Sequence, residues 1–251
     1  ASACSSPWMG LLAAPVAGVL VALLLALFGL RYRVNQIVVG VVLNVLVSGL
    51  TGFLFSTFLS SSPSLNQALR LPTLAVPLLS RIPVIGPVLF RQTILVYLMY
   101  AAVAILSAML FRSRWGLRLR ACGEHPKAAD TVGIKVMRTR VANLALAGAL
   151  AGLGGAFFTV GSGLSFDNDM TAGNGYIALA AMILGAWRPL GSLGAALLFG
   201  FATSVAQTLP VIGSSVSPDI ISMIPYIVTI LAVAGFVGKV RAPAAEGVPY
   251  P

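Results

Sequence analysis

The chain has 251 residues, of which 58% are hydrophobic and only 9% are charged, and its mean hydropathy is +0.97. About a quarter of the residues of a soluble domain are charged, so this composition excludes an ordinary water-soluble fold. The net charge of +10 would suit nucleic-acid binding. However, the basic residues lie between long apolar runs rather than on one surface, which disfavours nucleic acid and is typical of a membrane protein.

Seven apolar segments predict membrane spans, because about 20 helical residues cross a bilayer core of about 30 Å. They are residues 9–30, 34–59, 92–111, 141–161, 176–187, 192–209 and 220–238. Segment 176–187 has only 12 residues. It crosses only if it extends back through 170–175, and otherwise it is a half-helix buried in protein. Five prolines interrupt residues 60–91, which predicts a loop on or dipping into the membrane surface.

The distribution of Lys and Arg predicts the orientation. If residues 112–140 are cytoplasmic, the cytoplasmic segments contain 13 Lys/Arg and the external segments contain three. Cytoplasmic loops of membrane proteins carry such an excess. We therefore expect the chain to start outside, to cross seven times and to end in the cytoplasm. Because residue 1 is Ala1 and the first residues run straight into a span, we expect a fragment that lacks N-terminal helices.

Residue types needed for catalysis are scarce. There is one histidine, His125, no Cys/His cluster with metal-ligand spacing and no G-x-x-x-x-G-K-[ST] phosphate loop. No ionisable residue lies in the middle of a predicted span, which disfavours ion-coupled transport. The sequence thus predicts no catalytic residue, no metal site and no ATP hydrolysis by this chain.

Two sets of uncharged residues stand out in the spans. Segment 141–161 has small residues four apart, Gly148 and Gly152 with the nearby Gly155, which predict close helix packing. Polar side chains form the second set: Asn44, Ser48 and Thr51 on one helical face, and Asn174 before the short segment. They would line a path for a hydroxyl-rich solute or make hydrogen bonds between helices, and the sequence leaves both readings open.

Residues 112–140 form a basic segment with eight of the 16 Lys/Arg. Within it, residues 124–133 predict one short helix, since Pro126 suits the first helical position and Gly133 suits the position after the end. Ala128, Ala129 and Val132 would form a small apolar face. A helix this short is not stable alone, so we expect it to lie against a partner. A solvated loop held by anionic lipid is the alternative.

The basic segment resembles the cytoplasmic loop of binding-protein-dependent ABC importer permeases, in the branch that includes ribose, branched-chain amino acid and nucleoside permeases. The family pattern is G-x-R-x-R-A-x-G-E-x-P-x-A-A-x-x-x-G-I. It is met at Gly116, Arg118, Arg120, Ala121, Gly123, Glu124, Pro126, Ala128, Ala129, Gly133 and Ile134. Residues 35–44, 149–156, 168–185 and the ending V-R-A-P-A-A-E-G-V-P-Y are similar to the simple-sugar/nucleoside subgroup.

The resemblance implies an all-α, polytopic helix bundle in which residues 1–251 form a single permease domain of a bacterial plasma membrane. Residues 112–140 would dock on a separate cytoplasmic ATPase, which hydrolyses ATP, while this chain binds no cofactor. The docking residues would be Arg118, Arg120, Gly123, Glu124, Pro126, Ala128, Ala129 and Gly133. Further implied partners are a second permease subunit, identical or different, and an external substrate-binding lipoprotein. The substrate would be a nucleoside or a simple sugar.

Two other functions remain as alternatives. A stand-alone channel or ion-coupled carrier for a small polar solute would need no ATPase. An intramembrane enzyme acting on lipid would need paired polar catalysts, which the spans lack.

Overall fold

The computed structural model describes residues 6–61, 66, 71–75, 90–163, 165–211, 223, 227, 230, 242–248 and 250. Contacts between Cα atoms divide the chain into two compact units. Unit 1 contains Ala1–Ala101, Arg118–Ala172 and Ala245–Pro251, and unit 2 contains Ala102–Leu117 and Gly173–Ala244.

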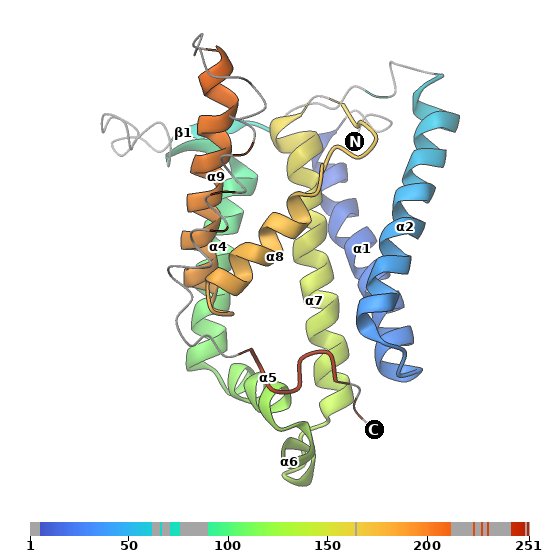
Figure 1. Ribbon diagram of the computed structural model, residues 1–251, viewed down its shortest axis with the longest axis vertical. Helices are drawn as coiled ribbons and strands as arrows, with labels where there is room; N and C mark the ends of the chain where they lie inside the picture. Colours follow the sequence, from blue (N-terminus) through green and yellow to red (C-terminus); the bar gives the residue numbers. More distant parts are fainter. Residues whose placement is uncertain are drawn as a thin grey trace. The chain divides into compact units, whose positions relative to one another are not determined.

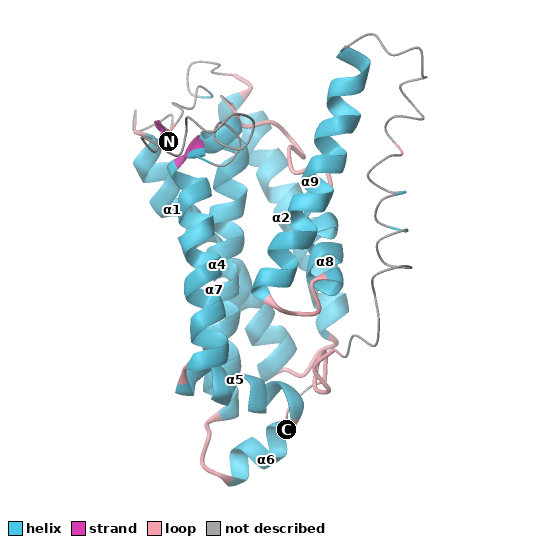
Figure 2. Ribbon diagram, turned by 90° about the vertical axis from the view of Figure 1, so that its left-hand side faces the viewer, coloured by secondary structure: helices cyan, strands magenta, loops and turns pink. Residues whose placement is uncertain are grey.

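Helices dominate the described part of the chain (Figure 2). Five are long and apolar enough to cross a membrane: Pro7–Arg31, Gln36–Leu59, Ile94–Arg112, Val136–Gly161 and Pro189–Leu209. They confirm the predicted polytopic helical fold and correspond to five of the seven predicted segments. The predicted span 220–238 and most of the predicted loop 60–91 lie outside the described residues.

Three of the long helices in unit 1 continue into a π-helical turn. Helix α1 (Pro7–Ala26) continues as η2 (Leu27–Arg31), and α2 (Gln36–Leu54) continues as η3 (Phe55–Leu59). Helix α7 (Val136–Ala156) continues as η6 (Phe157–Ser162). The start of α2 is set by Asn35, whose side chain accepts hydrogen bonds from the N–H groups of Ile37 and Val38 at 2.9 and 3.4 Å.

Helices α1 and α7 pack side by side in unit 1 (Figure 1). A Cβ added to Gly148 would overlap the carbonyl of Gly18 and the side chain of Ala22, and a Cβ on Gly152 would overlap the carbonyl of Ala14. Ala14, Gly18 and Ala22 are themselves four residues apart in α1. The two helices therefore meet along facing rows of small residues, a packing typical of membrane helices.

Residues between α2 and α4 add a small sheet to unit 1. Strand β1 (Thr73–Ala75) pairs antiparallel with β2 (Arg91–Thr93), with Thr73 opposite Thr93. The sequence analysis predicted a loop over residues 60–91 and no strand pair here, while the fold as a whole is helical as predicted. Nearby, Leu71 donates its N–H to the carbonyl of Val160 at 3.0 Å, and both side chains are buried with Leu95 and Ala156.

The basic segment 112–140 is mostly helical. After α4 (Ile94–Arg112) come α5 (Arg114–Glu124) and α6 (Pro126–Thr131), and α7 already begins at Val136. One short helix was predicted here, and α5 was not. Its signals were Ser113, whose Oγ accepts the N–H of Gly116 at 3.1 Å, and apolar side chains at spacings of four and three (Trp115, Leu119 and Cys122).

Unit 2 contains a pair of packed helices, α8 (Asn174–Leu184) and α9 (Pro189–Val211). Helix α8 has 11 residues, which span about 16 Å, so it is a half-helix and not a full span. The turn after it is tight: a Cβ on Gly185 would overlap the backbone of Gly191 and Ser192, and Ala186 and Trp187 adopt positive φ angles of 56° and 54°.

Candidate functional site

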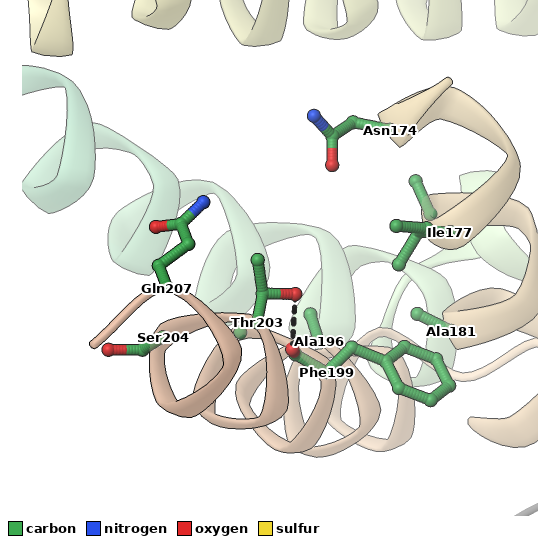
Figure 3. A pocket seen from close by; sticks show the side chains of 10 residues that line it. Asn174, Ile177, Ala181, Ala196, Phe199, Thr203, Ser204 and Gln207 are labelled. Atoms are coloured by element: carbon green, nitrogen blue, oxygen red, sulfur yellow. Dashed lines mark hydrogen bonds between the residues drawn. The ribbon is translucent and has the colours of Figure 1, made fainter. Parts of the chain in front are cut away.

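A groove lies between α8 and α9 in unit 2, with a volume of about 340 Å³ (Figure 3). Its walls come from Asn174, Ile177, Ala178 and Ala181 of α8, and from Ala196, Phe199, Gly200, Thr203, Ser204 and Gln207 of α9. Small buried residues let the two helices approach: Ala181 is 4% exposed and Ala195 is 6% exposed. This volume lies within the usual range of ligand sites, roughly 300–1,000 Å³.

The groove has a polar part and an apolar part. The amides of Asn174 and Gln207 extend from the two helices, and the hydroxyl of Ser204 lies beside Gln207 (Figure 3). The hydroxyl of Thr203 donates to the carbonyl of Phe199 at 2.9 Å, so it retains acceptor capacity for a ligand. Ile177, Ala181 and Phe199 supply the apolar wall. All ten lining residues are uncharged, so the groove suits a neutral solute with both apolar and hydrogen-bonding groups.

Of the four predicted substrate-path residues, Asn174 lines this groove. The other three lie on α2 in unit 1, where Asn44 and Ser48 are exposed within the chain. The hydroxyl of Thr51 donates to carbonyls of its own helix, those of Val47 at 2.8 Å and Ser48 at 3.0 Å. Thr51 therefore binds its own backbone in this structure.

The sequence analysis missed the polar groove residues of α9. Thr203, Ser204 and Gln207 interrupt an otherwise apolar span at spacings of one, three and four, which places them on neighbouring positions of one helical face. That pattern matches the one noted in the second span and was available in the sequence.

The basic segment contains a second candidate site, built on a small core. Cys122 of α5, Ala129 of α6 and Val136 of α7 are 2%, 3% and 1% exposed and pack together. Burial raises the pKa of the Cys122 thiol, although the positive charge of Arg140 acts in the opposite direction. Helix α6 thus rests on its neighbours in the chain, as a helix of six residues must.

Pro126 and Gly133 occupy the ends of α6. Pro126 is its first residue, and Gly133 follows its last turn with a φ of +84°, a conformation that costs other residues energy. Of the remaining docking candidates, Arg118, Arg120 and Glu124 are exposed on α5, and Gly123 is half-buried there.

The predicted common apolar face of α6 is wrong. Ala129 is buried, whereas Ala128 is exposed and Val132 is 75% exposed. Consecutive helical residues point about 100° apart, so adjacent alanines face different directions. The exposed residues of α6 and of the position after it are Lys127, Ala128, Asp130, Thr131 and Val132.

Gly148 and Gly152, predicted for helix packing, lie at the contact of α1 with α7. Gly155 differs: a Cβ built on it has no atom within 4 Å among the described residues. It lies on an exposed side of α7. The facing row Ala14, Gly18 and Ala22 in α1 was not predicted.

Residues 1–233 match the family described as "Branched-chain amino acid transport system / permease component". The chain belongs to this family of ABC transporter permeases. The chain is 40% identical to the guanosine ABC transporter permease protein NupQ of Bacillus subtilis, over 98% of this chain and 78% of the relative. It is 41% identical to the nucleoside ABC transporter permease protein NupC of Lactococcus lactis, with the same shares covered.

Other similar permeases carry other substrate names. The putative glucose ABC transporter permease of Haloferax volcanii is 30% identical, over 89% of this chain and 73% of the relative. No solved structure matches the permease. Within the part of the chain that the structure describes, no three His, Cys, Asp or Glu residues group as metal ligands do.

Proposed function

We propose that this permease subunit moves nucleosides inward as part of an ABC importer of the bacterial plasma membrane. It works with a second permease subunit, a cytoplasmic ATPase that binds and hydrolyses the ATP, and an external substrate-binding lipoprotein. The two relatives at 40% and 41% identity are named as guanosine and nucleoside permeases. The excess of Lys and Arg in the segments around 112–140 supports a cytoplasmic C-terminus.

The observation that carries the choice of substrate is the groove between α8 and α9. A nucleoside is uncharged at neutral pH and joins a flat, weakly polar base to a ribose with several hydroxyls. The amides of Asn174 and Gln207 can donate and accept hydrogen bonds, while Ile177 and Phe199 give apolar contact. A sugar lacks the base and gains less from the apolar wall.

The basic segment supports the coupling to an ATPase. Its exposed α6 surface is small and mixed in character, and the helix ends are held by Pro126 and Gly133. Two states of one packed element, selected by the partner, are what coupling to alternating access requires. A stand-alone channel or ion-coupled carrier is not favoured, because the relatives are permeases of ABC transporters.

Replacing the groove amides tests the substrate assignment. Asn174→Leu and Gln207→Leu replace the amides by apolar groups and so remove the hydrogen-bonding groups, and each should lower guanosine uptake roughly tenfold. Uptake of radiolabelled guanosine and glucose is measured in vesicles with the complete importer. Thr208→Val is the matched control, because its hydroxyl binds the carbonyl of Ser204 at 2.8 Å and does not line the groove. Undiminished guanosine uptake by the double variant, or uptake of glucose instead, would contradict the proposal.

A further inference from the structure

Residues 245–248 and Tyr250 lie on the basic segment. The N–H of Ala245 donates to the carbonyl of Gly123 in α5 at 2.9 Å. The guanidinium of Arg140 in α7 donates to the carbonyl of Val248 at 3.0 Å. In Figure 1 the dark-red segment passes beside α5 and the start of α7. The tail, defined as residues 245–248 with Tyr250, is therefore tied to two helices through its backbone.

Tyr250 contacts the side chains beneath the tail. It packs against the core of Cys122, Ala129 and Val136, which come from α5, α6 and α7 in turn. Its ring also lies under Arg140, with the guanidinium carbon 5.8 Å from the ring centroid. Loss of solvent raises the pKa of the Tyr250 hydroxyl, and the hydrogen bond and charge of Asp130 in α6 raise it further.

These contacts have a consequence for α6. A helix of six residues takes its position from whatever it packs on. Ala129, the residue of α6 buried in this core, shares it with Tyr250. Removing the ring would uncover one side of the core and leave α6 held by α5 and α7 alone.

We propose that the C-terminal tail holds α6 in place, with Tyr250 as the positioning residue of the ATPase-coupling element. This rests on the proposed function in that α6 is taken to receive the motion of the ATPase. The tail limits how far α6 can shift when the ATPase moves it. By contacting both helices, the tail joins α6 to the first turns of α7, so that the two move together.

The thiol of Cys122 reports on the tail directly, because it is 2% exposed and shares the core with Tyr250. In a Cys4→Ser background it is the only cysteine of this chain. We expect Tyr250→Ala to speed its reaction with N-ethylmaleimide about tenfold in the assembled importer, because local opening of the core limits the reaction. Tyr250→Phe keeps the ring and should react nearly as slowly as the parent. Glu246→Ala, an exposed position of the same tail, is the matched control.

Coupling is the second measurement. Guanosine transported per ATP hydrolysed should fall several-fold in Tyr250→Ala and recover in Tyr250→Phe. An unchanged labelling rate in Tyr250→Ala would overturn the docking of the tail. Faster labelling with an unchanged ratio of guanosine transported to ATP hydrolysed would overturn the role of Tyr250 in positioning α6.

Failure of the proposed function can be distinguished from failure of the proposal about the tail. A parent importer that takes up neither guanosine nor uridine contradicts the substrate assignment alone. The labelling rates need no transported solute and still decide whether the tail is docked. In that case the ATPase activity of the assembled complex, instead of uptake, is compared between Tyr250→Ala and Tyr250→Phe. Equal ATPase activity in the two variants overturns the role of Tyr250 in positioning α6.

Discussion

At the scale of single residues, the absence of a Cβ decides where two helices meet. Gly148 and Gly155 lie on the same helix, but Gly148 faces the backbone of α1, whereas a Cβ on Gly155 has no neighbour within 4 Å in the described part of the chain. A periodic pattern of small residues predicts that a helix packs closely. It does not say which members of the pattern make the contact, because that depends on the partner's position.

Replacing these two glycines by alanine should change stability in opposite directions. Gly148→Ala forces a Cβ into the carbonyl of Gly18, and overpacking of this kind costs about 1–3 kcal/mol. The Cβ added in Gly155→Ala has no described atom within 4 Å. This substitution should therefore leave stability unchanged or raise it by up to about 1 kcal/mol, since alanine favours the helix over glycine. The melting temperatures of the detergent-solubilised permease carrying each variant compare the two. Equal melting temperatures would contradict the packing of α1 on α7.

At the scale of elements, the local sequence sets the ends of the short helix α6, and its neighbours in the fold set its orientation. Pro126 and Gly133 predict its two ends, and in the structure Pro126 is its first residue and Gly133 follows its last turn. Its orientation depends on α5, α7 and the tail, and Tyr250 of the tail is more than 120 residues away from Ala129 along the chain. Sequence reasoning therefore gave α6 an apolar face that the fold splits between core and surface.

Glutamate placed at the two adjacent alanines separates these roles. Ala129→Glu puts a charge into the core with Cys122 and Val136, so the permease should insert but melt at a lower temperature. Ala128→Glu lies on the exposed surface and should leave the melting temperature unchanged while reducing ATP-driven uptake at least tenfold. Uptake and thermal stability are measured on both. Normal uptake by Ala128→Glu would remove α6 from the contact with the ATPase.

At the scale of the whole molecule, the prediction concerns the source of the energy that drives uptake of the solute. The described spans carry no carboxylate in their middle, and the family couples to a separate ATPase. We expect vanadate, or loss of the ATPase subunit, to abolish guanosine uptake in vesicles. A protonophore at constant ATP should leave it within about a factor of two, because no proton gradient drives the step. Uptake that persists without the ATPase would favour the carrier alternative.

What the sequence determined by itself was the class of the molecule. The positions of five apolar spans and the ends of α6 were readable from local pattern, because bilayer thickness and helix geometry constrain neighbouring residues. The family motif was readable from the spacing of its residues. The strand pair β1–β2 and the early start of α7 at Val136 were not, since a hydropathy pattern marks the membrane core and not where backbone pairing or a helix ends.

The tertiary structure alone decided which residues meet. It identified α8 as a half-helix packed on α9, brought Asn174 and Gln207 to one groove, and laid Tyr250 on Cys122 and Ala129. Asn174 and Gln207 are 33 positions apart, and Tyr250 is more than 120 positions from Cys122 and Ala129. Such pairs are selected by the packing of all the helices at once, and local sequence carries no record of that choice.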